Sequence, residues 1–450
     1  MIEKIETQLK LLDIFAALKN RKNTVFLDSQ KDKNRLGKYS FLGLYPFLIF
    51  KVKNNKIIIE KDRKINEYYA QDPFLELKKL LDQYNVENNT HLPFIGGAMG
   101  YIGYDSNKYL EEIKINSIDD VNIYDIYMAF YDSVIIYDHM NEEMFLSSLN
   151  IEKHEKIKGL IEKAKKFNYK KKNRYLNINI KFNMTKDYYL KSIEKIKDYI
   201  YQGDVYQVNF TQRIEVDLIK KPEEVFFDLR VINPAPFASY IDTGEFQIIS
   251  CSPERFIRLK NNIVETRPIK GTRPRGKNEK INEYNKKELL NSAKDKAELL
   301  MIVDLERNDL SKVCIPGTVK VPELFVLEEY ATVYHLVSTV VGKLDKNNNA
   351  IDLIKATFPG GSITGAPKIR AMEIIDELEP TQRNIYTGSI GYIGFDNVMD
   401  LNIVIRTIVC KEQKAYAQFG GGIVWDSNPI EEYEESLTKG KALIEGLRMI

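Results

Sequence analysis

The sequence predicts an α/β sandwich built from mixed β-sheets with helices between the strands. A run of β-branched and aromatic residues at Thr24–Asp28 is typical of a strand. Apolar residues at helical spacing predict helices over Lys186–Gln202 and Lys286–Leu305. Alternating apolar and polar residues predict further strands at Met399–Val409 and Ala415–Val424.

The composition is typical of a soluble globular protein. The 450 residues include 66 Lys plus Arg and 64 Asp plus Glu, and a net charge of +2 gives no electrostatic reason to expect nucleic-acid binding. No apolar run approaches the roughly 18 residues of a membrane span, and the N-terminus lacks a signal peptide. Three Cys, none in a CxxC pair, fit a reducing compartment. We therefore expect a cytoplasmic protein without a membrane or nucleic-acid partner.

Three regions of the chain differ in composition and in sequence pattern. Residues 1–150 mix short helical and strand-like stretches, residues 151–185 form a Lys-rich connection that begins with a helix, and residues 186–450 contain most of the motifs. The segments Gly97–Asp105 and Gly388–Asp396 resemble each other. Their small residues suggest strands that another backbone approaches closely. They also suggest a pseudo-duplicated architecture, with chance similarity as the alternative.

A basic segment punctuated by Pro and Gly, Glu265–Gly276, is the first candidate functional motif. It contains four cationic residues: Arg267, Lys270, Arg273 and Arg275. Such a segment can present cations and backbone N–H groups to an anion. Crowding by other cations would lower the pKa of Lys270 and free its amine as a nucleophile. A solvated basic loop is the alternative interpretation.

A glycine loop followed by a helix is the second motif. It spans Phe358–Pro380, with Pro367 placed for the first turn of the helix and Pro380 after its end. A glycine loop that leads into a helix N-terminus can bind an anion, and a purely structural turn is the alternative. The segment is not a complete phosphate-binding loop, because Lys368 lies too late in it.

Two acidic helices form the third motif. Asp295 and Glu298 are neighbours on the first predicted helix. Glu432, Glu435 and Lys439 share one face of the second. Carboxylates from two helices without His or Cys suit a hard cation such as Mg²⁺. A solvated charged face is the alternative.

Arg406 lies in the middle of the β-branched run Leu401–Val409, where we expect it to be half buried and to need an anionic partner. A structural ion pair is the alternative to a substrate contact. The glycines of Gly420–Gly422 can leave backbone N–H groups open at a strand end. Together these features predict a Mg²⁺-dependent site for a small polyanionic substrate, without defining the reaction.

Five segments resemble, in the same order, motifs of the chorismate-utilising enzymes. They are Ser252–Arg255, Pro268–Thr272, Met301–Asp309, Phe358–Pro380 and Phe419–Asp426. The resemblance covers nearly the whole chain. It implies two large, mostly antiparallel β-sheets packed together with helices outside, chorismate as substrate and Mg²⁺ as cofactor. Residues 1–150 resemble the N-terminal region of anthranilate synthase component I, and residues 186–450 resemble the chorismate-binding catalytic region.

The resemblance also implies roles for single residues. Lys270 matches a nucleophile, and Glu254 matches the general acid that assists loss of the 4-hydroxyl. Glu298 and Glu435 match metal ligands, with Asp295 and Glu432 as further support. The positions that match the lining of the chorismate pocket are Gly271, Thr272, His335, Thr364, Tyr386, Arg406, Gly420, Gly422 and Lys439.

Two positions discriminate between reactions within the family. Lys270 is typical of aminodeoxychorismate synthases, whereas anthranilate synthases usually carry Ala there. Gln207 stands where isochorismate and salicylate synthases place a Lys that activates water, so addition of water is disfavoured. The resemblance therefore implies conversion of chorismate and ammonia to 4-amino-4-deoxychorismate, for 4-aminobenzoate and folate synthesis. Anthranilate synthesis and a catalytically inactive regulatory subunit are the alternatives.

The resemblance further implies a partner and an effector. The family pairs this subunit with a glutamine amidotransferase, and no Cys here lies in the Gly-x-Cys-x-Gly context of a glutaminase. We therefore expect ammonia to come from a separate amidotransferase subunit. The N-terminal region of relatives binds tryptophan, and Ser29, Tyr39 and Pro236 match that pocket. The segment Asn233–Phe237 departs from the anthranilate-synthase pattern Asn-Pro-Ser-Pro-Tyr.

Overall fold

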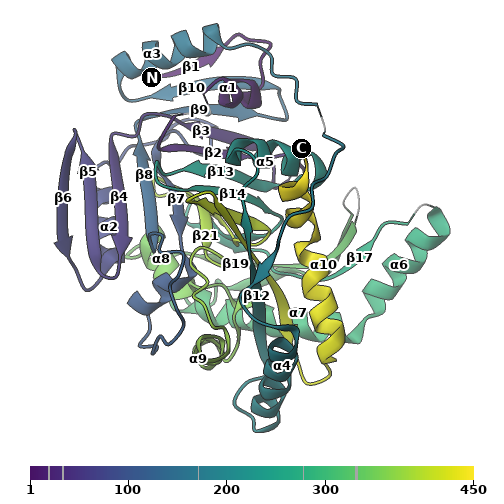
Figure 1. Ribbon diagram of the computed structural model, residues 1–450. Coiled ribbons are helices and arrows are strands. Elements are labelled where there is room, and N and C mark those ends of the chain that lie inside the picture. The colour runs from purple at the N-terminus through teal and green to yellow at the C-terminus, as the bar shows by residue number, and fades with distance from the viewer. Residues whose placement is uncertain (19–20, 33–34, 171, 277, 330–332) are drawn as a thin grey trace.

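Two large β-sheets, with helices packed around them, make up the computed structural model (Figure 1). The structure describes residues 1–18, 21–32, 35–170, 172–276, 278–329 and 333–450. Within these residues each sheet has twelve strands. Every pairing between two named strands is antiparallel. The two-sheet architecture is thus confirmed, whereas the expectation of mixed sheets is wrong.

The first sheet runs, in spatial order, through β1 (Ile2–Ile5), β10 (Glu143–Ser148), β9 (Ser133–Asp138), β3 (Tyr39–Gly43), β2 (Thr24–Asp28), β13 (Phe237–Asp242), β14 (Gln247–Ser252), β23 (Thr407–Lys411), β24 (Lys414–Ile423), β12 (Gln207–Asp217) and β11 (Lys181–Phe182), with β20 (Gly365–Ala366) also paired to β12. The second runs through β17 (Ile269–Pro274), β19 (Val333–Lys343), β16 (Ile263–Thr266), β15 (Arg255–Lys260), β22 (Met399–Asn402), β21 (Ser389–Gly394), β7 (Gly97–Ile102), β8 (Ile126–Tyr131), β4 (Leu48–Lys53), β5 (Lys56–Lys61) and β6 (Lys64–Tyr69), with β18 (Lys320–Glu329) also paired to β19.

The helices are α1 (Leu11–Leu18), α2 (Pro73–Asp82), α3 (Ile151–Lys163), α4 (Lys186–Tyr201), α5 (Pro222–Ile232), α6 (Glu279–Asn291), α7 (Ala293–Ser311), α8 (Ala350–Thr357), α9 (Lys368–Leu378) and α10 (Pro429–Arg448), with short 3-10 turns η1 (Tyr104–Tyr109) and η2 (Gly361–Ile363). Three buried clusters hold these layers together. One joins strands of both sheets, including Val25 and Phe41 of the first and Met99 and Tyr127 of the second. The other two lie between a sheet and helices such as α5 and α10, or α2 and α8.

Each sheet joins a block of strands from residues 1–148 to a block of strands from residues 181–423. β2 pairs with β13 in the first sheet, and β7 pairs with β21 in the second. This second pair consists of the two segments that resemble each other in sequence, and Gly100 lies opposite Gly391. The expected close approach of backbones is therefore confirmed, with the two segments lying directly against each other. The boundaries at 150 and 185 stay a prediction, and residue 171 of the connection lies outside the described residues.

Two predicted elements are interrupted. The helix expected over Lys286–Leu305 is broken at Ser292, which ends α6 and caps α7 by accepting a hydrogen bond from the Asp295 N–H. The strand expected over Met399–Val409 is two strands in different sheets. The chain crosses between the sheets after β22, and Arg406 has φ of 52° in that crossing. The remaining predicted helices and strands named above are confirmed, including the helix that begins the Lys-rich connection.

The helices of the structure differ in length and in apolar character. None of them, within the residues the structure describes, combines sufficient length with sufficient apolar character to cross a membrane.

Candidate active site

Lys270 lies on β17 at a bulge in the pairing with β19. The register shifts between Lys270 and Thr272, and Gly271 adopts φ of 74° between them. A Cβ at Gly271 would also approach the Asp295 Cγ to 2.8 Å. The bulge therefore requires glycine, both for its backbone conformation and for space. The bulge places the side chains of Lys270 and Thr272 at one edge of the second sheet.

The Lys270 amine is held in an enclosed environment. Its Nζ lies 3.5 Å from the carbonyl oxygen of Ser362. Burial lowers the pKa of Lys270, the nearby Lys439 ammonium lowers it further, and the carboxylates of Glu298, Glu254 and Glu435 act in the opposite direction. The sequence suggested that other cations would lower this pKa. Burial is in fact the larger cause.

Glu254 precedes β15 and lies beside the same loop. The Ser362 hydroxyl donates a 2.9 Å hydrogen bond to Oε1 of Glu254. Burial raises the pKa of Glu254 to about 7, although the Ser362 hydrogen bond and the Lys270 charge lower it. A carboxyl group with this pKa can donate and accept protons near neutral pH. Ser362 thus connects the predicted acid and the predicted nucleophile, one through its hydroxyl and the other through its carbonyl.

Thr272, His335 and Arg406 form a second group. The Thr272 hydroxyl lies 2.8 Å from Nδ1 of His335. Burial, and then the charge of Arg406, lower the pKa of His335 to about 4. His335 is therefore neutral at pH 7, and an uncharged imidazole beside a guanidinium adds no repulsion toward an anion.

Arg406 has an amide, not a carboxylate, as its neighbour. Its Nη1 donates to Oδ1 of Asn233 at 3.3 Å. Within the described part of the chain no carboxylate lies within ion-pair distance of Arg406, and burial lowers its pKa. The alternative of a structural ion pair is therefore not supported. A buried guanidinium that lacks an anionic partner in the protein is suited to bind a carboxylate of a ligand.

Carboxylates of α7 and α10 lie close enough for their charges to affect one another. Burial raises the pKa of Glu298 and of Glu432, and the Glu432 charge contributes to the rise at Glu298. Burial alone would raise the pKa of Glu435, but the ion pair with Lys439 at 2.8 Å outweighs it and holds the pKa low. The Lys439 Nζ also donates to the Gly420 carbonyl oxygen at 3.1 Å.

Two of these carboxylates lie close enough together to supply oxygens to a magnesium ion. The space above Gly421, where a Cβ would stand, is 3.3 Å from Nζ of Lys439, 3.4 Å from Oε2 of Glu432 and 3.9 Å from Oε1 of Glu435. No three His, Cys, Asp or Glu side chains of the described residues converge on one point. Mg²⁺ typically takes one or two protein carboxylates and completes its shell with water and substrate oxygens. The charge of Asp295 also acts on Glu298, but its Oδ2 already accepts a hydrogen bond from Nη2 of Arg273 at 3.0 Å.

Gly420 and Gly422 lie on β24 against β12. Gly422 pairs with Asn209, and a Cβ there would approach Nε2 of Gln207 to 2.4 Å. The Gln207 side chain is fully buried, and neither its Oε1 nor its Nε2 has a hydrogen-bond partner among the described residues. An unsatisfied buried amide is costly, so its polar atoms are available to a ligand or to water.

Thr364 and Tyr386 are held by one buried ion pair. Arg383 pairs with Glu379 at 2.7 Å, and both side chains are almost fully buried. Arg383 also donates to the carbonyl oxygens of Ile363, at 3.0 Å, and Asn209, at 2.6 Å. Arg383 thus fixes the backbone directly before Thr364, and its own carbonyl oxygen accepts from the Tyr386 N–H at 2.9 Å. Thr364 and Tyr386 lie next to this ion pair, and among the described residues no hydrogen bond joins either of them directly to Lys270.

Sequence reasoning missed three residues of this arrangement: Ser362, Arg383 and Asn233. Ser362 lies inside the glycine loop of Phe358–Pro380, whose sequence pattern predicts an anion-binding turn but no role for the serine. Arg383 follows Pro380 and belongs to no motif. Asn233 opens the segment considered for the effector, and only the fold brings it to Arg406.

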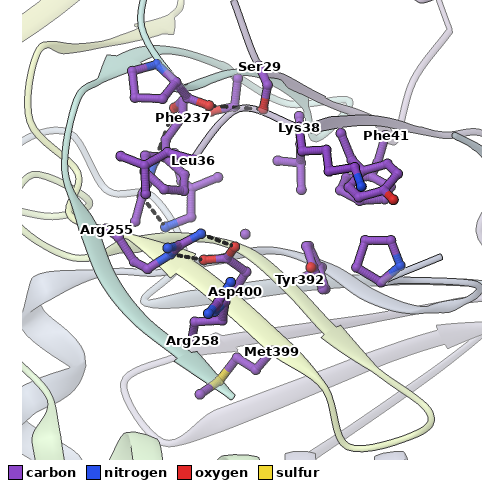
Figure 2. Close-up of a pocket in the computed structure, with 18 of the residues that line it drawn as sticks. Ser29, Leu36, Lys38, Phe41, Phe237, Arg255, Arg258, Tyr392, Met399 and Asp400 are labelled. Carbon is purple, nitrogen blue, oxygen red and sulfur yellow. Dashed lines mark hydrogen bonds and ion pairs between the residues drawn. The ribbon is translucent and has the colours of Figure 1, made fainter. Parts of the chain in front are cut away.

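A separate cavity contains all three residues predicted to bind an effector. Ser29, Tyr39 and Pro236 line it, and the Ser29 hydroxyl donates to the Pro236 carbonyl oxygen at 3.0 Å. Figure 2 shows Arg255 on its wall, paired with Asp400 through two hydrogen bonds of 2.9 Å. Because Arg255 directly follows Glu254, this wall is covalently continuous with the predicted catalytic acid.

Comparisons with known proteins agree with this arrangement. Residues 22–445 match the family described as chorismate binding enzyme. The chain is 38% identical over 440 residues to aminodeoxychorismate synthase component 1 of Bacillus subtilis (strain 168), covering 96% of this chain and 93% of that protein. It is 36% identical over 454 residues to anthranilate synthase component 1 of Aquifex aeolicus (strain VF5), covering 97% and 92%.

A solved structure of a related protein has a similar fold. The crystal structure of anthranilate synthase component I from Streptococcus pneumoniae TIGR4 superimposes with a TM-score of 0.81 at 32% identity, covering 90% of this chain and 92% of that one. The family match over residues 22–445 includes Lys270, Glu254 and Arg406. The chain therefore belongs to the family of chorismate binding enzymes and is a chorismate-utilising enzyme.

Proposed function

We propose that this enzyme aminates chorismate at C4 and forms 4-amino-4-deoxychorismate. The observation that carries the proposal is the arrangement of Lys270 and Glu254 on opposite sides of Ser362. It supplies an enclosed amine whose pKa is lowered beside a carboxyl group whose pKa is raised to about 7. Glu254 can thus donate a proton near neutral pH, and the lowered pKa of Lys270 favours its amine as a nucleophile.

Substrate binding is assigned to the cations of the site. Arg406, which has no carboxylate partner among the described residues, binds one carboxylate of chorismate with Thr272 and neutral His335 beside it. The second carboxylate faces the end of the site where α7 and α10 meet. When bound there by Glu298 and Glu435, with Glu432 and Asp295 nearby, Mg²⁺ would neutralise substrate charge.

The chemical steps use Lys270 and Glu254. Lys270 attacks C2 of chorismate while the hydroxyl leaves C4, and Glu254 gives its proton to that hydroxyl, which departs as water. Ammonia then attacks C4, the bond between C2 and Lys270 breaks, and the proton lost by the incoming nitrogen returns to Glu254. The sum is chorismate plus ammonia to 4-amino-4-deoxychorismate plus water. Direct attack by ammonia at C2 would instead lead toward anthranilate.

Gln207 supports ammonia as the nucleophile. Its amide cannot remove a proton from water as a lysine amine can, so addition of water to chorismate is disfavoured. Both polar atoms of this amide are buried without a partner among the described residues. They offer a donor and an acceptor to a small polar molecule at the Gly422 end of the site.

A glutamine amidotransferase subunit is proposed as the source of ammonia. The relatives named above are called component 1, which implies a further component. This chain has three cysteines, and all are buried. Burial raises the pKa of Cys251 to about 12 and of Cys314 to about 11, and it also raises that of Cys410. None of them therefore has the thiolate character of a glutaminase nucleophile.

Anthranilate formation is the second candidate. It is favoured by the relatives and the solved structure that bear the name anthranilate synthase at comparable identity. The test is to incubate the purified protein with chorismate, Mg²⁺ and ammonium and to identify the product by chromatography and mass spectrometry. 4-Amino-4-deoxychorismate as the main product supports the proposal, and anthranilate as the main product overturns it.

A further inference from the structure

An amide that the proposed mechanism does not use lies against the guanidinium of Arg406. Nη1 of Arg406 donates a 3.3 Å hydrogen bond to Oδ1 of Asn233. Among the described residues this is the one hydrogen bond that the guanidinium makes. A guanidinium carries only donors, so the neighbouring amide must present its oxygen and not its nitrogen. The contact therefore fixes the orientation of the Asn233 side chain.

The backbone of Asn233 is held on both sides. Asn233 is the C-cap of α5, and its N–H donates to the Leu229 carbonyl oxygen at 2.7 Å. Pro234 follows and cannot continue the helix. The N–H of Ala235 then donates to Oε1 of Gln30 at 3.3 Å, and its carbonyl oxygen accepts from the Gln30 N–H at 3.1 Å. Oδ1 of Asn233 is thus an acceptor carried by a backbone that two separate elements anchor.

The backbone of Arg406 is anchored independently of Asn233. It lies in the crossing between the sheets with φ of 52°, and its carbonyl oxygen accepts from the N–H of Cys251 on β14 at 3.0 Å. These backbone contacts do not direct the far end of an arginine side chain, which has many rotamers. The direction of the guanidinium is therefore set at its tip, by Asn233.

The lack of charge on Asn233 is as important as its position. An aspartate here would place a carboxylate oxygen about where Oδ1 lies, 3.3 Å from Nη1 of Arg406. That ion pair would compete with a carboxylate of the ligand. The amide orients the guanidinium without neutralising it. Nδ2 of Asn233 is enclosed and has no partner among the described residues. Because a buried unpaired donor is costly, the amide is of use here for its oxygen.

We propose that Asn233 is a positioning residue for substrate binding: it directs the Arg406 guanidinium and leaves its positive charge for a carboxylate of the substrate. This role rests on the proposed function, in which Arg406 binds chorismate. Asn233 acts through Arg406 and does not itself contact the substrate. Asparagine, and not aspartate, is therefore required at this position for substrate affinity.

The test is Asn233→Asp, which keeps the shape of the side chain and adds a negative charge. Consumption of chorismate is measured with ammonium and Mg²⁺, whatever the product. We expect KM for chorismate to rise by about tenfold or more while kcat changes little, because a charged hydrogen bond to the substrate is weakened. Asn66→Asp, at an exposed position on β6, is the matched control and should keep the original KM. An unchanged KM in Asn233→Asp, or a fall in kcat alone, would overturn the proposal.

Asn233→Ala separates the direction of the guanidinium from its charge. It removes the acceptor and adds no carboxylate, so we expect a rise in KM that is smaller than in Asn233→Asp. Equal rises in the two variants would contradict the need for a neutral residue. If Asn233→Asp does not fold, an unchanged KM in Asn233→Ala would overturn the proposal by itself.

A binding measurement makes the result independent of turnover. Chorismate without ammonium should raise the melting temperature of the unaltered protein and of Asn66→Asp, and it should raise that of Asn233→Asp much less. An equal rise in all three proteins would contradict the role of Asn233. Anthranilate as the main product would overturn the proposed function and leave both the KM comparison and the binding comparison intact.

Discussion

The Oγ of Ser362 lies 2.9 Å from Oε1 of Glu254, while the carbonyl oxygen of the same serine lies 3.5 Å from Nζ of Lys270. One residue of a glycine loop thus contacts both a carboxyl group just before β15 and an amine on β17. Because both groups are enclosed, burial shifts their pKa values toward each other, upward for the acid and downward for the amine.

Replacing Ser362 by Ala should therefore change the titration of Glu254 more than it changes the fold. The hydroxyl lowers the pKa of Glu254, so its loss should raise that pKa above about 7. We expect turnover to fall by roughly tenfold, since a hydrogen bond to a charged group contributes about 1.5–3 kcal/mol. The pH dependence of kcat/KM and the melting temperature, measured together, check this. A fall in activity with an unshifted pH profile would contradict it.

Glu254→Gln should remove both catalysis and a pH dependence of stability. The pKa of Glu254 is raised in the folded protein, so folding is favoured while the group is protonated, and this contribution is lost as pH rises from about 4.5 through about 7. This contribution to the free energy of unfolding is about 3 kcal/mol at most. Urea unfolding of the two proteins between pH 4.5 and 8 measures it. We expect the curves to converge at the acid end and turnover to fall by about 10²–10⁴-fold.

His335 should have the opposite effect on stability. Its pKa is lowered to about 4 in the folded protein, so the unfolded chain binds the proton more readily between about pH 6.5 and 4. Stability is therefore lost as pH falls through this interval. His335→Gln should flatten this acid loss by up to about 3 kcal/mol. Equal slopes for both proteins in urea unfolding at pH 4.5, 5.5 and 6.5 would argue against a neutral, buried imidazole.

Gln207 should show opposing effects on stability and activity. Its amide atoms are buried without partners among the described residues, which costs about 1–3 kcal/mol. Gln207→Met keeps the length of the side chain and removes the polar atoms. We expect a higher melting temperature and a loss of ammonium-dependent turnover. Thermal unfolding and product formation, measured on the same preparation, check this. A variant that is less stable and equally active would contradict the role of the amide.

The cavity lined by Ser29, Tyr39 and Pro236 should bind a tryptophan-like ligand. Stabilisation by a ligand follows mass action, about 2.7 kcal/mol at a hundredfold excess over Kd. We expect tryptophan to raise the melting temperature of the unaltered protein, and Tyr39→Ala to abolish the rise. Tyr69→Ala, at an exposed position on β6, is the matched control and should retain it. If tryptophan changes the melting temperature of neither the unaltered protein nor Tyr69→Ala, the assignment of this cavity to a tryptophan-like ligand is wrong.

Local patterns predicted most of the elements, because capping residues and alternating apolar residues act over a few positions. They failed to predict the break between two helices at Ser292. They also failed in the crossing that contains Arg406, because the end of each strand there depends on which sheet the strand joins. A run of β-branched residues gives no signal that the chain changes sheets within it. The same limit applies to the two similar segments, whose direct pairing is visible only in the fold.

The candidate site follows the same rule. Lys270, Glu298, Glu432 and Glu435 could be selected because each lies in a motif with a clear chemical pattern. Ser362 and Arg383 could not, since their roles depend on burial and on neighbours that are distant in sequence.

The central claim is that Lys270 becomes covalently attached to the substrate. The most direct measurement is the intact mass of the protein after incubation with chorismate and Mg²⁺ without ammonium, followed by peptide mapping. We predict an adduct of chorismate minus water on Lys270, its release when ammonium is added, and no adduct in Lys270→Ala. An adduct that persists in Lys270→Ala, or that maps to another residue, would contradict the account.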